Sequence, residues 1–225
     1  MKFYGQFADP AVDQYLYEEF FKFTTNGFFI ECGAANGIAD SSCKFFEEFL
    51  EWKGINIEAH PEIFSQLQKN RPNSINLNCA LTSPEEDGEI LKFNAYNFKD
   101  GCSLISEFGK HAPIGYLDSA KNYREEIKTA GTLINAAGQL KIKGISYSSL
   151  IKNNDIKNVD LFVLDVEGSE LDVIKGMKGC KVLPKIIYLE RPPDWMWDAV
   201  LQGTDRAPRS ILADMDPINP PPLVF

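Results

Sequence analysis

Short apolar segments that end at an acidic residue recur along this chain and alternate with helix-like patterns. Segments 28–31, 55–59 and 159–168 read FFIE, INIEA and VDLFVLDVEG. Residues 39–54, between the first two segments, place apolar side chains at helical intervals and end at a glycine. Repetition of buried strand, turn and amphipathic helix predicts parallel strands joined by right-handed crossovers. The sequence therefore predicts an α/β fold, with a Rossmann-like, doubly wound, mostly parallel sheet and helices on both faces.

The chain length favours a single domain. At 225 residues with 44% apolar content, the chain is large enough to bury one core. Residues 97–145 lack sustained periodicity, so we expect an insertion or lid there. Residues 192–225 are Pro-rich and predicted to be irregular. No antiparallel strand pair is predicted after Arg191. We therefore expect the edge of the sheet near the end of the chain to be altered or to be completed by a second copy of the chain.

Charge and hydropathy exclude several classes of partner. The net charge is −9, and no Lys/Arg cluster forms a phosphate-tracking stripe, so nucleic acid is not an expected partner. No window reaches the roughly eighteen apolar residues of a membrane span, and the first residues lack a signal-peptide core. We therefore expect a cytoplasmic protein. The five cysteines are widely spaced, which predicts reduced, mostly buried thiols.

Acidic residues follow the predicted strands at one edge of the sheet. Ligands of open α/β sheets bind beyond the carboxyl ends of parallel strands. Gly33 and Gly37 allow a sharp turn there, and the turn amides attract an anionic group. Glu58 follows Gly37 by about twenty residues, the offset of an acid that binds a ribose diol. These residues predict an adenosine-containing cofactor.

The acid before the turn narrows the choice of cofactor. The GxGxxG pattern is absent, and Glu31 is poorly suited to lie beside a pyrophosphate. Its carboxylate suits a ligand with an ammonium or sulfonium group. S-adenosylmethionine carries both groups, together with a carboxylate for the turn amides and a ribose for Glu58.

Residues 24–191 resemble the FkbM-type methyltransferases in the order and spacing of GFFIECGAANG, INIEAH, NCAL and VDLFVLDVEGSE. Members of this family have the class I methyltransferase fold and mostly methylate hydroxyl groups with S-adenosylmethionine. The resemblance implies a turn and strand-end cofactor site, with Cys79 and Ala80 beside the adenine. The implied cofactor-binding residues are Glu31, Gly33, Ala34, Asn36, Gly37, Glu58, Ala59, Cys79, Ala80 and Asp165.

The resemblance also implies the residues of the reaction centre. Asp165 and Glu167 match the acidic motif beside the transferable methyl group, where either acts as a base or helps to bind a divalent ion. His111 is an alternative base. The expected acceptor is a hydroxyl of a sugar-like compound, a glycan or a small natural product. Two rival hypotheses are a nicotinamide-dependent oxidoreductase and a catalytically inactive module that binds the cofactor.

Overall fold

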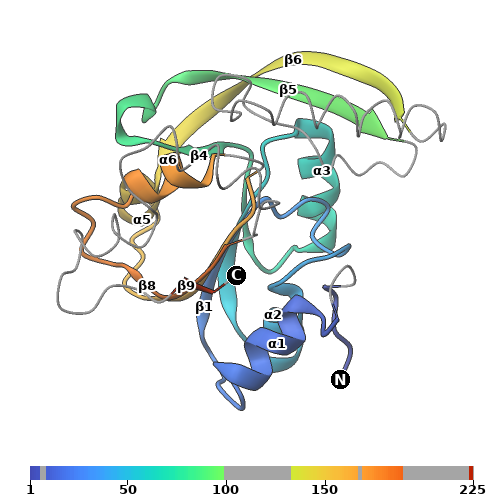
Figure 1. Cartoon of the computed structure of the whole chain (residues 1–225), viewed down its shortest axis with the longest axis vertical. Coiled ribbons are helices and arrows are strands. Elements are labelled where there is room, and N and C mark those ends of the chain that lie inside the picture. Colours follow the sequence, from blue (N-terminus) through green and yellow to red (C-terminus); the bar gives the residue numbers. More distant parts are fainter. Residues whose placement is uncertain (6–8, 99–132, 167–168, 190–222, 225) are drawn as a thin grey trace.

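A parallel sheet forms the centre of the molecule (Figure 1). The computed structural model describes residues 1–5, 9–98, 133–166, 169–189 and 223–224. Six strands lie in the order β3-β2-β1-β7-β8-β9, and each neighbouring pair is parallel. Their bounds are β1 Phe28–Cys32, β2 Lys53–Ile57, β3 Ile75–Leu77, β7 Val159–Leu164, β8 Pro184–Leu189 and β9 Leu223–Val224. The predicted α/β fold with a parallel sheet is confirmed.

Helices cover both faces of this sheet because β1 and β7 are apolar on both faces. Figure 1 shows α1 and α2 on one side of β1, and α5 and α6 on the other. The helices are α1 Val12–Glu19, α2 Lys44–Leu50, α3 Pro61–Asn70, α5 Tyr147–Asn153 and α6 Glu170–Lys175. The core on the α1 and α2 side includes Leu16, Phe29, Phe46 and Leu161. The core on the α5 and α6 side includes Ile30, Leu150, Phe162 and Ile174.

Local capping interactions and backbone conformation set the start of α3 and the end of α2. His60 precedes α3, and its Nδ1 accepts a hydrogen bond from the Glu62 amide at 3.3 Å, while Pro61 occupies the first turn. Helix α2 ends at Leu50, because Glu51 adopts a left-handed conformation with a φ of 58°. The sequence pattern placed this stop at Gly54, which instead lies within β2. The left-handed cap is formed by a non-glycine residue, so composition did not reveal it.

A second, smaller sheet adjoins the first. Strand β6, Leu133–Ser146, pairs in parallel with β4, Ala80–Thr82, and antiparallel with β5, Ile90–Phe98. Figure 1 shows β5 and β6 as a long ribbon that passes over one end of α3. A short 3₁₀ helix, Pro84–Glu86, leads from β4 toward β5. The sequence pattern did not identify β6, because its partner β5 lies far away in the chain and its own residues do not alternate strictly.

Two chain segments differ from their predicted form. The sequence of residues 74–81, SINLNCAL, predicts one strand, but β3 and β4 are separate and belong to different sheets. The Asn78 side chain lies between them and donates hydrogen bonds to the carbonyls of Glu58 and Ala59. Near the C-terminus, which was predicted to be irregular, β9 adds a parallel strand to β8. Within the described ranges, no helix has the length and apolar character that crossing a bilayer requires.

Candidate active site

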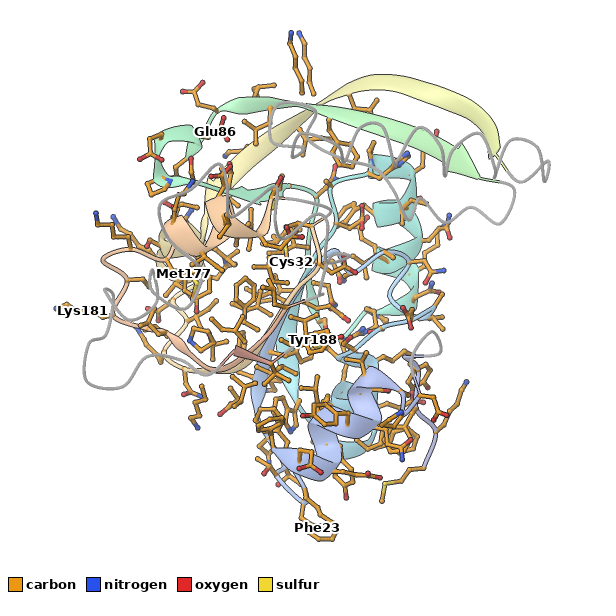
Figure 2. All side chains as sticks on the ribbon, viewed as in Figure 1. Phe23, Cys32, Glu86, Met177, Lys181 and Tyr188 are labelled. Carbon is orange, nitrogen blue, oxygen red and sulfur yellow. The ribbon has the colours of Figure 1, made fainter. Side chains whose placement is uncertain are left out.

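A pocket opens where β1, β2 and β7 end. These strands are adjacent and parallel, so their carboxyl ends meet at one edge, as expected for a ligand site in an α/β sheet. Cys32, labelled in Figure 2, marks the end of β1 in the interior of the molecule and lines this pocket. The space measures about 840 Å³, and this volume includes the part that is open to solvent.

Most of the predicted cofactor-binding residues line this pocket. Those that do are Glu31, Gly33, Ala34, Glu58, Ala59, Cys79, Ala80 and Asp165. Asn36 and Gly37 are not among the lining residues. The pocket is also lined by residues that the sequence patterns did not indicate, which are Cys32, Ala35, Ala39, Asp40, Ser41, Ile57, Leu81, Phe93 and Val166. Phe93 comes from β5, whose position over the pocket depends on the second sheet.

The turn after β1 is held tightly against the neighbouring strands. Gly33 has a φ of +82°, and its amide and that of Ala34 both donate to the Ile57 carbonyl at 3.0 Å. A Cβ atom at Gly33 would lie 1.9 Å from the Asp165 carbonyl oxygen. Glycine is therefore required at this position both by the backbone conformation and by the close approach of β7.

Asn36 and Gly37 shape the turn from outside the pocket. The Asn36 Oδ1 accepts hydrogen bonds from the amides of Ile38 and Ala39, each at 2.9 Å. Gly37 has a φ of +78°, and a Cβ atom there would lie 2.7 Å from the Arg71 side chain. Asn36 and Gly37 therefore fix the conformation of the turn, whereas the small residues before them line the pocket.

Glu58 lies directly after β2 and connects that strand to the turn. Its Oε2 accepts a hydrogen bond from the Ala35 amide at 3.0 Å, and its Oε1 accepts one from the His60 amide at 2.7 Å. Burial raises the pKa of Glu58 to about 7, although these amides act in the opposite direction. A carboxylate has about four lone-pair sites, so Glu58 retains acceptor capacity toward the pocket.

Glu31 is enclosed by protein groups. Ser41 Oγ donates to its carboxylate at 2.9 Å, the Cys43 amide donates at 3.1 Å, and Arg71 Nη1 lies 3.3 Å from Oε2. Burial raises the pKa of Glu31 above its usual value, although Arg71 and these hydrogen bonds oppose the shift. No sequence pattern indicated Arg71 or Ser41 as a site residue. Arg71 lies at the end of α3, and no local pattern links it to β1.

The third strand end carries the predicted reaction centre. Asp165 follows β7, lines the pocket, and donates its backbone amide to the Cys32 carbonyl at 3.1 Å. The other two predicted catalytic residues, Glu167 and His111, lie outside the described residues. Among the residues that the structure describes, no group of three or more His, Cys, Asp or Glu side chains is arranged to hold a metal ion.

The remaining wall of the pocket is small and apolar. Cys32, Cys79 and Ala80 are buried beside Phe93. Burial raises the pKa of the Cys79 thiol to about 12, so the thiol stays protonated and acts as a small apolar group. Cys32, Cys43, Cys79 and Cys180 are free thiols, as predicted, and Cys102 lies outside the described residues.

A comparison with protein families identifies the family of the chain. The model of the methyltransferase FkbM domain matches residues 31–202, which include the turn, Glu58, Cys79, Ala80 and Asp165. Searches of curated proteins and of solved structures found no match. The family model covers well over half of the 225 residues. The chain therefore belongs to the FkbM methyltransferase domain family.

Proposed function

We propose that the protein uses S-adenosylmethionine to methylate a hydroxyl group of a sugar-like compound, a glycan or a small natural product. The observation that carries the proposal is Glu58, which lies at the pocket with its carboxylate fixed by two backbone amides and retains acceptor capacity. An acid fixed in this way, one strand away from a glycine turn, suits a ribose diol. The family of the chain supports a methyl donor over other adenosine-containing cofactors.

The residues around the pocket fit the parts of S-adenosylmethionine. Gly33 keeps the turn free of side-chain atoms where β1 and β7 approach each other. Cys79 and Ala80 present small groups to a flat base, and Phe93 adds an aromatic surface. Glu31 provides negative charge for the amino-acid end. When bound, S-adenosylmethionine would supply an electrophilic methyl group on a sulfonium.

The chain itself must orient the acceptor and remove its proton. We assign proton removal to Asp165, because it lines the pocket at the end of β7. Glu167 and His111 stay proposed as partners in this step, and binding of a divalent ion by the acidic motif stays an alternative way to acidify the hydroxyl. We also propose that residues 97–145 cover the acceptor and exclude water.

Calorimetry with two ligands tests the cofactor. S-adenosylhomocysteine should bind to the purified protein, whereas NAD should not. The opposite preference would favour the nicotinamide-dependent oxidoreductase and remove the methyltransferase proposal. Binding of S-adenosylhomocysteine with no methylation across a panel of hydroxylated acceptors would favour an inactive binding module.

Substitution of Asp165 tests the reaction. Asp165→Asn should leave the affinity for S-adenosylhomocysteine nearly intact and reduce turnover by about a hundredfold or more, as expected for loss of a general base. Methyl transfer to an acceptor is measured by mass spectrometry at matched cofactor saturation. Unchanged turnover would exclude Asp165 as the base and as a metal ligand.

A further inference from the structure

A buried charged cluster lies behind the pocket, formed by Glu31, Ser41, Glu47 and Arg71. The Arg71 side chain is 0% exposed, and those of Glu31 and Glu47 are 4% and 14% exposed. Arg71 Nη1 donates to Glu31 Oε2 at 3.3 Å and to Ser41 Oγ at 3.1 Å, while Nε donates to Glu47. Of the four residues, Glu31 and Ser41 line the pocket, and Glu47 and Arg71 do not.

The charges of this cluster do not balance. Two carboxylates share one guanidinium, which leaves one negative charge in excess when both acids are ionised. Arg71 Nε donates to Glu47, whereas Nη1 is shared by Glu31, Ser41 and the Gly37 carbonyl. Part of the guanidinium charge is therefore directed at the acid that lies away from the pocket, and the acid that faces the pocket is compensated only in part.

Burial of an excess carboxylate is unfavourable unless a cation joins it. The raised pKa of Glu31 is consistent with this deficit, since Arg71 is close and yet does not offset the cost of burial. An ammonium group in the pocket would restore the balance. Glu31 is the member of the cluster through which this excess charge reaches the pocket.

We infer that Glu47 is a positioning residue, which holds the Arg71 guanidinium so that Glu31 keeps its negative charge for the cationic amino-acid end of the ligand. This inference rests on the proposed function, because it takes the ligand to be S-adenosylmethionine or its product. It assigns a role in ligand selection to a helix α2 residue that does not line the pocket. If Glu47 is neutral, Arg71 and Glu31 form a balanced pair, and the pocket loses its preference for an ammonium group.

The test compares two ligands that share the adenosine part. S-adenosylhomocysteine carries the ammonium and carboxylate of the amino-acid end, whereas 5′-methylthioadenosine lacks both. Glu47→Gln should fold, since the Gln oxygen can still accept the Arg71 Nε–H bond. It should weaken S-adenosylhomocysteine by about five- to tenfold and leave 5′-methylthioadenosine unchanged, both measured by calorimetry.

Two further variants make the test specific. Glu48→Gln makes the same charge change on the same helix, but Glu48 pairs with Lys44 and Tyr4 outside the cluster, so both affinities should stay unchanged. Glu47→Asp keeps the charge and should retain most of the preference. Thermal melts check that each variant is folded before binding is measured.

The other outcomes separate the inference from the proposed function. If the wild type binds S-adenosylhomocysteine and Glu47→Gln binds it equally well, the inference is overturned and the proposed function stands. Equal weakening of both ligands by Glu47→Gln would mean a general structural role and would also overturn the inference. A wild type that binds neither ligand would remove the proposed function and the inference together.

Discussion

Glu31 and Glu58 stand at the ends of neighbouring parallel strands, yet their surroundings differ. The Glu31 carboxylate is nearly enclosed by Ser41, the Cys43 amide and Arg71, and it belongs to a buried ionic cluster. The Glu58 carboxylate accepts hydrogen bonds from the amides of Ala35 and His60 and is half-buried. A position at a strand end thus predicts which edge an acid occupies. The partners of the acid decide how much of its negative charge is already compensated by other groups of the protein.

The same contrast applies to the contributions of the two acids to stability. Glu31 depends on a cation that comes from a distant helix end, whereas the donors to Glu58 are backbone groups within a few residues of the strands. Loss of a partner should therefore cost far more at Glu31 than at Glu58. The following predictions test this contrast, from the largest expected effect to the smallest.

Removal of the Arg71 guanidinium, which Glu31 and Glu47 share, should lower the stability of the protein most. Arg71→Met leaves the buried Glu31 and Glu47 carboxylates without their guanidinium and should lower the free energy of unfolding by about 3–5 kcal/mol. Urea denaturation measures the change. As a control, Lys157→Met removes the partner of Asp155 in an exposed pair and should cost less than about 0.5 kcal/mol. Similar losses in both variants would contradict the difference between the two environments.

The turn between the two acids should be the next most sensitive feature. Gly33→Ala places a Cβ 1.9 Å from the Asp165 carbonyl oxygen and should cost about 3 kcal/mol of stability. Gly88 has a similar φ of +84°, but nothing lies within 4 Å of a Cβ there. Gly88→Ala should therefore cost about 1 kcal/mol, which represents the backbone conformation alone. Equal costs would show that the approach of β7 is not tight.

Loss of the Glu58 carboxylate should affect ligand binding. Glu58→Ala should weaken S-adenosylhomocysteine by more than about 1 kcal/mol, because hydrogen bonds from the ribose hydroxyls to a charged acceptor are lost. Glu62→Ala removes an exposed acid in the first turn of the adjacent α3 and should leave the affinity unchanged. Calorimetry with unchanged affinity for Glu58→Ala would remove Glu58 from the site.

The raised pKa of Glu58 predicts a pH dependence of stability. The pKa rises from an ordinary value of 4.5 to about 7 in the folded protein. The contribution of the carboxyl group is therefore fully present below about pH 4.5 and is lost as the pH rises through about 7. Between pH 5 and pH 8, the wild type should lose about 1 kcal/mol more of its free energy of unfolding than Glu58→Gln does. The difference is smaller than the pKa shift alone would give, because solvent at the pocket screens the carboxylate. Urea denaturation of both proteins at these pH values measures the difference, and parallel pH profiles would contradict it.

Sequence patterns predicted the central sheet because its strands are apolar on both faces. They also predicted the glycine turn and the acids at the strand ends, which follow from short segments of chain. They failed at the second sheet, where β6 pairs with a strand that lies far away in sequence. They also treated residues 74–81 as one strand, although the Asn78 hydrogen bonds to the Glu58 and Ala59 carbonyls lie where β3 ends and β4 begins.

The sequence by itself determined the α/β fold, the edge of the sheet that carries the pocket, and the family of the chain, because these depend on local periodicity and on residue order. Only the tertiary structure decided how the acids are used. Arg71 reaches Glu31 across forty residues of sequence, and Phe93 enters the pocket from a separate sheet. The charge and shape of the pocket depend on such contacts between distant segments, and those contacts form only when the layers pack together.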